Sequence, residues 1–387
     1  MRIWYVADAR LPGRAANTVQ IMKMCAAFGA AGAEVTLHVR LGAEGADTGL
    51  FNYYAVPRSF QIVRAPRLIP GRSARDRWNI PFTLSILPHL KLGSRKYDLI
   101  YTRLPLLALL APRMGLRVAF EAHRLVPEDG FLSSRLSRAF PGATRQPAFA
   151  GLVGISRVLC DWYEQRGVPA AKVLVAHDGV DLERFEPALS KAEARVRLNL
   201  PVDQAIVGYC GHFYAGRGID ELLSCATRMK SVLFLLVGGN EGDVKRVGEQ
   251  AAGLGLTNVR LTGFQPNAEL PRYLFAADVL AMPYNAQTGS AVFMSPMKMF
   301  EYMAAGRPIV ATNFPSVREV LRDGENAILV EPGSADSLRS GLVRALESPE
   351  SAALGRQAQL DVRNLTWLKR AAEILRFVKA GGHPLHE

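Results

Sequence analysis

The sequence contains little that would point to a secreted or membrane-spanning protein. Its four cysteines, Cys25, Cys160, Cys210 and Cys225, show no paired spacing. We therefore expect buried free thiols in a reducing compartment, and neither a disulfide framework nor a zinc site is supported. No apolar run approaches the roughly 18 residues of a transmembrane helix, and the stretch before Asp8 is too short for the apolar core of a signal peptide. These absences predict a soluble, cytoplasmic chain.

Several ligand-binding signatures are also missing. No Gly-Lys-Ser/Thr follows a glycine loop, which excludes a Walker site, and no GxGxxG fingerprint opens a helix after a strand. No Asp-x-Asp motif occurs, so metal-held phosphates are not predicted. The basic residues are separated by Pro and Leu and form no aromatic-interleaved binding motif, so nucleic acid is the less expected partner.

Length and charge indicate two domains, of which one is strongly basic. A chain of 387 residues exceeds what one hydrophobic core normally organises. The net charge is +12, and between Arg58 and Arg145 there are 16 Lys/Arg against 5 Asp/Glu. This uneven distribution favours an anionic partner or an anionic membrane surface. A basic surface that only keeps the protein soluble is the alternative.

The middle of that basic region mixes arginines with large apolar side chains, a combination suited to a membrane surface. These residues are Arg64, Arg67, Arg72, Arg75 and Arg77 with Trp78, Ile80, Phe82 and Leu84. We therefore expect weak peripheral attachment to the inner face of the membrane, serving a lipid-linked or anionic glycan.

Short apolar strands alternate with helical patterns in two successive series, which is typical of α/β domains with parallel sheets. The N-terminal segment MRIWYVADAR predicts a short strand, Ile3–Val6, that Asp8 interrupts. The further strands expected in the first series are Val35–Val39, Leu99–Tyr101, Val118–Glu121 and Leu152–Ile155, with a helix over Asn17–Ala31. Loops and short helices are expected between Pro57 and Arg95, where Pro and Arg are frequent.

The strand pattern restarts after Asp181–Pro201, which places the domain boundary there. Strands are expected at Ile206–Cys210, Leu233–Val237, Val259–Leu261, Val279–Ala281, Ile309–Ala311 and Ala327–Val330. Helices are expected at Ile219–Met229, Val244–Leu254, Ala268–Phe275, Met297–Ala305 and Ala335–Leu346, with a last helix over Trp367–Val378. The predicted domains are residues 1–180 and 181–364.

One carboxylate stands out in the segment SPMKMFEYMAAGRPIVAT. The helix Met297–Ala305 would bury Met299, Phe300 and Met303 against a sheet and leave Glu301 near its start, at the carboxyl edge of the strands. A carboxylate there can accept hydrogen bonds from both hydroxyls of a ribose. An ordinary amphipathic helix with a solvated Glu301 is the alternative.

A second candidate segment is the loop GYCGHFYAGRGID, from Gly208 to Asp220. The chain leaves a strand at Gly211 and enters a helix after Gly218, so that backbone amides and the helix N-terminus face an anion. Arg217 adds a forked donor suited to a diphosphate. His212 is either a phosphate ligand or a packed loop histidine.

Two further candidates lie in the first half. His123 follows the strand VAFE and is released at its carboxyl edge, although a lone histidine is more often structural. In the loop DARLPGRAAN, which ends at Asn17, Gly13 and its small neighbours permit close approach of a ligand. A flexible surface loop is the alternative.

Together these segments resemble the retaining nucleotide-sugar glycosyltransferases of the GT-B fold (glycosyl transferases group 1, family 4 type). The resemblance runs through most of the chain in the family's order. It implies two Rossmann-like domains facing across a cleft, an acceptor-side first domain, and a C-terminal segment 365–387 that crosses back onto that domain. VLVAHDGVDLERF resembles the turn that introduces the second domain, and Phe264 lies in a strand pair that the family places near the nucleotide base.

The resemblance assigns roles to individual residues. Glu301 would hold the donor ribose, His123 would lie beside the donor sugar, and Gly13 and Asn17 would belong to a loop near the donor phosphates and acceptor. The family usually has an arginine and a lysine in the loop where this chain has His212 and Arg217. The catalytic candidates are therefore His123, Arg217 and Glu301.

One departure concerns the donor sugar. Many family members carry a glutamate eight residues before the ribose glutamate, where this chain has Phe293, and no acid lies between Tyr284 and Phe300. The Ser-Pro-Met-Lys form resembles a subgroup with Lys298 facing the cleft. The backbone amides from Met294 to Met297, a segment that also contains Ser295 and Pro296, are expected to replace the missing glutamate.

The sequence thus predicts metal-independent transfer of a sugar from a nucleoside-diphosphate sugar, a co-substrate rather than a cofactor, to a glycan, lipid-linked or small-molecule acceptor. Retention of configuration comes from the resemblance alone. Two alternatives stay open. A nucleotide-sugar epimerase would need a further acid/base group, for which Glu121 is a weak candidate. A catalytically silent nucleotide-sugar-binding homologue would fit the substitutions at Phe293 and His212.

Overall fold

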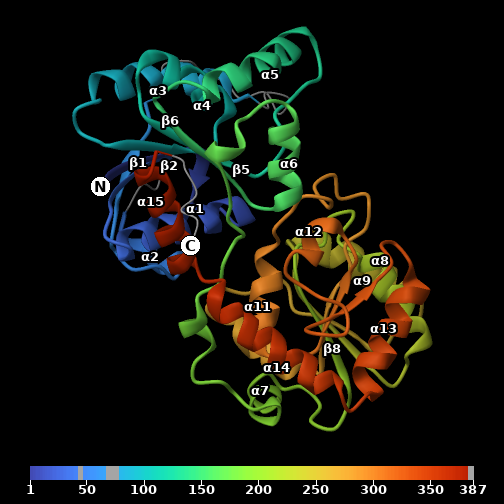
Figure 1. The fold of residues 1–387 in the computed structure, drawn as a ribbon. Coiled ribbons are helices and arrows are strands. Elements are labelled where there is room, and N and C mark those ends of the chain that lie inside the picture. Colours follow the sequence, from blue (N-terminus) through green and yellow to red (C-terminus); the bar gives the residue numbers. More distant parts are fainter. Residues whose placement is uncertain (42–46, 67–77, 382–387) are drawn as a thin grey trace. The chain divides into compact units, whose positions relative to one another are not determined.

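The structure is a computed structural model that describes residues 1–41, 47–66 and 78–381 (Figure 1). The chain divides into two compact units: Met1–Asp178 together with Trp367–Glu387, and Gly179–Thr366. Within the described residues, no helix is long and apolar enough to cross a membrane. Each unit is built around one parallel sheet.

The first unit contains a seven-stranded parallel sheet with the strand order β3-β2-β1-β4-β5-β6-β7. The strands are β1 (Arg2–Leu11), β2 (Glu34–Leu41), β3 (Gln61–Arg64), β4 (Leu99–Thr102), β5 (Val118–Ala122), β6 (Phe149–Gly154) and β7 (Val173–Val175). The helices are α1 (Ala16–Ala30), α2 (Asp47–Tyr53), α3 (Ile80–Leu92), α4 (Pro105–Leu110), α5 (Phe131–Thr144), α6 (Arg157–Gln165) and α15 (Trp367–Lys379).

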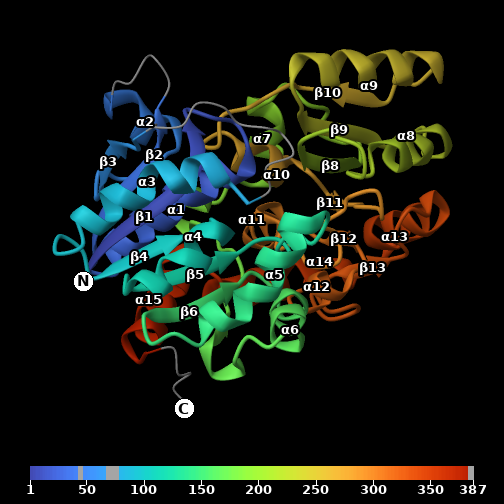
Figure 2. The ribbon, with the colours of Figure 1, turned by 90° about the horizontal axis from the view of Figure 1, so that it is seen from above.

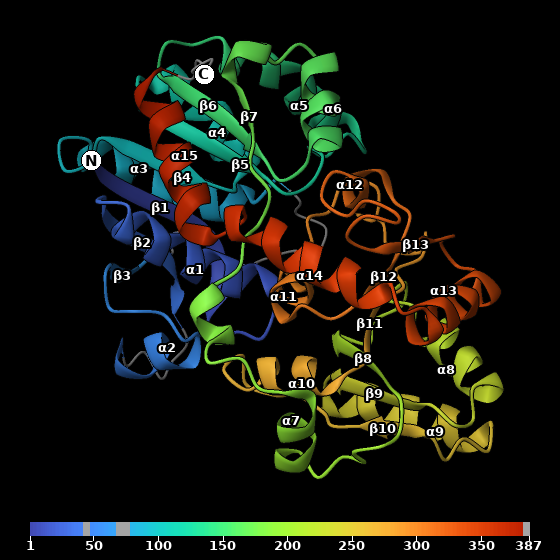
Figure 3. The ribbon, with the colours of Figure 1, turned by 60° about the horizontal axis from the view of Figure 1, so that its bottom comes forward.

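The last helix, α15, belongs to this first unit, as the resemblance implied. It packs against α1 and β6 (Figure 3). It buries Trp367, Ala371, Ile374 and Phe377, so its apolar stripe completes the core on that side of the sheet.

The second unit contains a six-stranded parallel sheet with the strand order β10-β9-β8-β11-β12-β13. The strands are β8 (Ile206–Gly211), β9 (Leu233–Gly238), β10 (Val259–Leu261), β11 (Val279–Met282), β12 (Ile309–Thr312) and β13 (Ile328–Val330). The helices are α7 (Lys191–Arg197), α8 (Ile219–Arg228), α9 (Glu241–Gly253), α10 (Leu270–Ala276), α11 (Met297–Ala305), α12 (Pro315–Arg318), α13 (Ala335–Glu347) and α14 (Ser351–Asp361).

Successive residues of these strands point to opposite faces, so the second sheet carries two cores. Val207 and Tyr209 of β8 pack with α8, α9 and α13. Ile206 and Cys210 of the same strand pack with α10, α11 and α14 on the other face. Figure 2 shows α8 and α13 on one side of the strands and α11 on the other. The helix α11 is thereby fixed against the sheet that carries the glycine loop.

Several features differ from expectation, and β3, α2 and α5 are among the elements that were not predicted. The first strand continues past Asp8 to Leu11, because the buried Asp8 carboxylate lies 2.5 Å from Nε of Arg40 and accepts a hydrogen bond from Asn79. The region 57–95 contains a thirteen-residue helix, α3, which holds Pro81 in its first turn and also tolerates Pro88. The helix α14 was not predicted. Cys25, Cys160, Cys210 and Cys225 are buried and free.

Candidate active site

The helix Met297–Ala305 forms as predicted, and it buries Met299, Phe300 and Met303. Glu301 lies in its middle rather than near its start, and its side chain is 17% exposed. Its Oε1 is 3.1 Å from Nη1 of Arg184, a residue of the 3-10 turn Leu182–Phe185. The other end of this guanidinium donates to the carbonyl of Asn267. Glu301 is therefore an oriented carboxylate and not a solvated one.

One turn earlier on the same helix, Lys298 directs its ammonium inward against aromatic rings. Its Nζ lies 3.8 Å from the ring centre of Tyr209 and 5.2 Å from that of Tyr284. The Nζ atom is buried, and none of the described residues provides it with a hydrogen-bond acceptor. Burial, followed by the charge of Arg217, lowers the pKa of Lys298 to about 7. An anion placed beside this ammonium would stabilise its charged form and raise its pKa.

The glycine loop faces this ammonium. A Cβ at Gly211 would lie 2.5 Å from Nζ of Lys298, and a Cβ at Gly218 would lie 1.9 Å from the carbonyl oxygen of Pro283. Gly218 also has a φ of +79°, which favours glycine. It precedes α8, whose N-terminal amides point into the loop. Only glycine therefore fits the place where the strand end meets the helix start.

Arg217 and His212 occupy different positions in this loop. The guanidinium of Arg217 lies 4.8 Å from the ring centre of Tyr284, which also faces Lys298. Among the described residues, no carboxylate forms an ion pair with Arg217 or Lys298. The imidazole of His212 stacks on Tyr214 with the ring centres 4.7 Å apart. Its packing against a neighbouring ring fits the packed-histidine alternative.

The segment expected to replace the missing glutamate leads directly into α11. Met294 and Ser295 are buried, Pro296 is the N-cap residue, and Met297 begins the helix. The loop that precedes this segment contacts the glycine loop, because the hydroxyl of Thr288 donates a hydrogen bond of 2.7 Å to the carbonyl of Gly216.

Two further positions named from the sequence are Phe293 and Phe264. Phe293 is half-buried, and Phe264, which follows β10, is 40% exposed.

The first unit holds the remaining candidates. His123 is the first residue after β5, as predicted, and its Nε2 lies 3.2 Å from Oε1 of Glu121. Burial, together with the charge of Arg103, lowers the pKa of His123 to about 4. Gly13 is clamped by Tyr54, whose hydroxyl accepts from its N–H at 2.7 Å and donates to its carbonyl at 2.9 Å. Asn17 is exposed on the first turn of α1.

Several residues of these sites were not identified from the sequence. Arg184 lies three residues after Asp181 of the Gly-Val-Asp turn, but only the fold brings it to Glu301. Tyr209 and Tyr284 line the Lys298 ammonium as ordinary strand and loop residues. Arg370 had a visible signal, because it is a charged residue on the apolar stripe of α15 with Trp367.

The arrangement in the second unit suits a diphosphate. Two cations without a carboxylate partner, a glycine loop and the N-terminus of α8 converge at the carboxyl end of β8, and Glu301 is held by a separate ion pair. Among the described residues, no group of three or more His, Cys, Asp or Glu side chains could hold a metal ion.

Two family models match the chain in succession. The model described as Glycosyltransferase Family 4 matches residues 18–184, and the model described as Glycosyl transferases group 1 matches residues 190–360. A D-inositol 3-phosphate glycosyltransferase of Streptomyces bingchenggensis is 33% identical over 183 residues, which are 43% of this chain and 38% of that protein. The protein of that name from Mycobacterium leprae is 29% identical over 209 residues, 51% and 46% of the two chains. The chain thus matches less than half the length of these relatives.

Solved structures share the fold over nearly the whole chain. HepE of Anabaena in complex with UDP has a TM-score of 0.76 at 19% identity, covering 98% of this chain and 100% of that one. Sucrose-phosphate synthase of Thermosynechococcus elongatus has a TM-score of 0.77 at 19% identity, covering 98% of each chain. With two consecutive family matches and this shared architecture of two parallel-sheet domains, the chain belongs to the glycosyltransferases of the GT-B fold.

Proposed function

We propose that this chain transfers a sugar from a nucleoside-diphosphate sugar to an acceptor, with retention of configuration and without a metal ion. The observation that carries the proposal is the pair of cations Lys298 and Arg217, which face Tyr284 and have no carboxylate partner among the described residues. A buried cation without a counterion is costly unless a ligand supplies one. A diphosphate is a ligand of the right charge.

The residues divide the work of such a transfer. The leaving diphosphate gains negative charge as the sugar carbon becomes positive, and fixed cations in a dry site stabilise that charge best. Arg217 and Lys298 would supply them, with the amides of the Gly211–Gly218 loop. Glu301 would accept hydrogen bonds from the ribose hydroxyls, and Arg184 would hold its carboxylate in place. Retention rests on the family resemblance.

The two alternatives receive different support. An epimerase would need an acid/base group, but Glu121 is fully buried and ion-paired with Arg370 at 2.6 Å. Burial would raise the pKa of Glu121, yet the charge of Arg370 holds it well below its ordinary value. Glu121 is thus a fixed anion and a poor proton donor. A silent binding homologue would keep the cation pair and differ only in turnover.

Donor hydrolysis in the absence of acceptor separates these functions. The chain would be incubated with UDP-, GDP- and ADP-sugars after a thermal-shift screen, since a ligand that binds the native state raises its stability. HepE was solved with UDP, so uridine donors come first. We expect slow hydrolysis of one donor, reduced about a hundredfold by Arg217→Ala. Lys230→Met, at an exposed lysine of the same unit, is the matched control and should leave the rate unchanged.

The outcomes are distinct. Binding without turnover indicates a silent homologue, and interconversion of sugars indicates an epimerase. Strong inhibition by EDTA that magnesium or manganese reverses would refute metal independence. Failure to bind any nucleotide sugar would overturn the proposal altogether.

We further propose that the acceptor is a lipid-linked or anionic glycan met at the inner face of the membrane. The expected contact residues need correction, because Trp78 and Phe82 are buried and only Leu84 of that group is clearly exposed and apolar. Arg67, Arg72, Arg75 and Arg77 lie outside the described residues. A better contact is the start of α5, where Phe131 is 74% and Leu132 56% exposed.

The charges around α5 support this choice. Arg135 lies over the ring of Phe131 at 4.3 Å, and Arg138 is exposed one turn later. The helix α4 contacts both α5 and α3, and α3 exposes Leu84 and ends at Leu92, which is 89% exposed. Apolar side chains beside arginines are the composition of helices that bind anionic interfaces.

Liposome sedimentation tests this attachment. Binding to vesicles with anionic lipid should exceed binding to neutral vesicles and fade with salt, because each basic residue near the surface contributes about 1 kcal/mol. The variant Phe131→Ser/Arg135→Glu should lose it, whereas Val196→Ser, at an exposed apolar position of the other unit, should not. Equal, negligible binding to both vesicle types would support the soluble alternative.

A further inference from the structure

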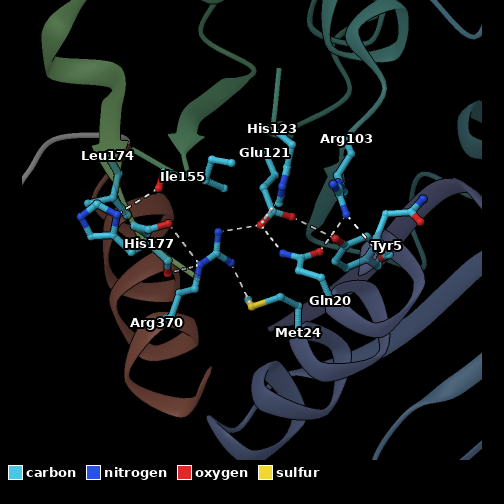
Figure 4. A network of polar contacts seen from close by, with 12 residues as sticks. Tyr5, Gln20, Met24, Arg103, Glu121, His123, Ile155, Leu174, His177 and Arg370 are labelled. Carbon is cyan, nitrogen blue, oxygen red and sulfur yellow. Dashed lines mark hydrogen bonds and ion pairs between the residues drawn. The ribbon is translucent and has the colours of Figure 1, made fainter. Parts of the chain in front are cut away.

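The first unit contains a buried ion pair that ties the last helix to the strand end before His123. Nη2 of Arg370 on α15 lies 2.6 Å from Oε1 of Glu121 on β5, and their side chains are 3% and 0% exposed (Figure 4). Removing two charges from water is costly, and an apolar pair of similar size is often at least as stable. Stability alone therefore does not explain why a buried ion pair stands next to His123.

The Glu121 carboxylate is held from several elements at once. Gln20 of α1 donates to Oε1 at 2.8 Å, and Tyr5 of β1 donates to Oε2 at 2.9 Å. Arg103, which follows β4, donates to the amide oxygen of Gln20 at 2.9 Å. The carboxylate thus has one position, set by three neighbouring strands and two helices (Figure 4).

Arg370 is equally constrained. Its Nε donates to the carbonyls of Ala176 and His177 at 3.2 and 2.8 Å, and its Nη1 lies 2.9 Å from the sulfur of Met24. Because all three nitrogens of this guanidinium are engaged, its position is fixed. It fixes Glu121 where the fold needs it, and it is supplied by the segment that follows the whole second unit.

His123 is the next residue in contact with the Glu121 carboxylate. Its Nε2 is 3.2 Å from Oε1 of Glu121. A carboxylate beside one ring nitrogen favours the proton on that nitrogen and leaves the other as an acceptor. The charged groups around the ring are Glu121, Arg103 and Arg370. The nearby Asp178 is buried, and burial raises its pKa to about 6 against the charge of Arg370.

We propose that Glu121 and Arg370 are positioning residues: Arg370 keeps Glu121 ionised and fixed, and Glu121 holds His123 with Nε2 protonated, so that Nδ1 accepts a hydrogen bond from a hydroxyl of the donor sugar. The proposal rests on the proposed function for the sugar contact, but the state of the histidine ring is independent of it. Neutral His123, whose pKa burial lowers to about 4, is the form that can accept such a bond.

The test reads the ring directly. Nitrogen NMR of histidine-labelled protein, with His123 assigned from the signal lost in His123→Gln, reports its tautomer and titration. Arg370→Met removes the charge that holds the pKa of Glu121 down and that also lowers the pKa of His123, so the Glu121–His123 pair should take up a proton at higher pH, which the ring nitrogens of His123 report as an apparent pKa. That pKa should rise by at least about one unit. Removing the carboxylate as well, in Glu121→Gln/Arg370→Met, should return the ring to a neutral form of mixed tautomers.

The rate of donor hydrolysis tests the effect of this network on turnover. Arg370→Met should lower turnover about tenfold or more and add a loss of rate below the raised pKa, while affinity for the nucleoside diphosphate stays within about twofold. The control is Arg195→Met, which breaks another buried ion pair, Arg195–Asp278 at 2.6 Å in the second unit. It should cost stability without changing the His123 signal.

Several results would overturn the proposal. One is an unchanged tautomer and titration of His123 in Arg370→Met. If that variant does not fold, the charge-neutral Glu121→Gln/Arg370→Gln decides, and a single Nε2-protonated form persisting there refutes the role of Glu121. If the wild-type chain turns over no donor, the proposed function fails, while the NMR result still supports or refutes the positioning network.

Discussion

The side-chain amine of Lys298 should take up a proton when the donor binds. In the empty site, burial and then the charge of Arg217 lower its pKa from 10.5 to about 7, while Cys210 and Glu301 act weakly in the opposite direction. A diphosphate beside Nζ reverses this effect on the pKa, because it adds negative charge where the described part of the chain offers no acceptor. The pKa of Lys298 in the complex should therefore return toward its ordinary value.

The magnitude follows from these two states. With a pKa of about 7 in the free site and full protonation in the complex, binding takes up about 0.5 proton at pH 7 and about 0.9 at pH 8. The sign is fixed, since the free site loses its proton as pH rises and the complex does not. Affinity should accordingly weaken by about fiftyfold between pH 7 and pH 9.

Calorimetry in two buffers of different ionisation enthalpy measures this uptake. A sugar nucleotide is the ligand of choice, because its diphosphate diester keeps the same charge across this range, unlike the terminal phosphate of a free nucleotide. The difference in apparent binding enthalpy between the buffers, divided by the difference in their ionisation enthalpies, gives the number of protons.

Variants identify the group. Lys298→Met should bind weakly and without proton uptake, and Lys298→Arg should bind with little dependence on pH, because arginine stays charged. Lys230→Met, at an exposed lysine of the same unit, should behave like the wild type. Uptake near zero at pH 8 in the wild type, or the same uptake in Lys298→Met, would refute the assignment of Lys298 as a phosphate ligand.

Three further outcomes test the second unit. Glu301→Gln should weaken nucleotide binding by roughly 1.5–3 kcal/mol, the cost of a charged hydrogen-bond partner, and unchanged affinity by calorimetry would remove the ribose role. Arg184→Met should weaken binding about tenfold because Glu301 loses its orientation; tighter binding would mean that the ion pair competes with ribose. Gly218→Ala should lower the free energy of unfolding in urea by roughly 2–4 kcal/mol, whereas Gly324→Ala, with a φ of +72° and open space, should lose only about 1–2; equal losses would contradict the contact with Pro283.

The sequence predicted those elements whose signal is local. Met297–Ala305 forms as expected because its apolar residues recur at helical spacing and Gly306, with a φ of +66°, ends it. The helix α14 was missed because Ala, Ser and Gln leave its apolar stripe faint. Its place depends on close approach, since a Cβ at Gly355 would lie 2.6 Å from the carbonyl of Gly306. The sequence of the eleven residues of α14 cannot show a contact with a distant carbonyl.

The candidate sites divide in the same way. His123 was predicted from its place at a strand end, and Arg217 from its place in the glycine loop. Both predictions rest on the fact that parallel strands bring their carboxyl ends to one edge of the sheet. The partners that orient these groups come from far along the chain. Arg184 and Glu301 are separated by 117 residues, and Glu121 and Arg370 by 249. Spacing in one sequence carries no information on such pairs.

Two clusters of buried charge differ in how they are compensated, and this contrast indicates where a ligand belongs. In the first unit, Glu121 and Arg370 neutralise each other, and each forms further hydrogen bonds. In the second, Lys298 has no acceptor and Arg217 has no carboxylate partner among the described residues. Fixed, neutralised charges hold a neighbouring group in place, whereas an uncompensated pair stores an unfavourable energy that an anion removes on binding. A nucleoside diphosphate should therefore stabilise the second unit against unfolding more than its contact area alone would suggest.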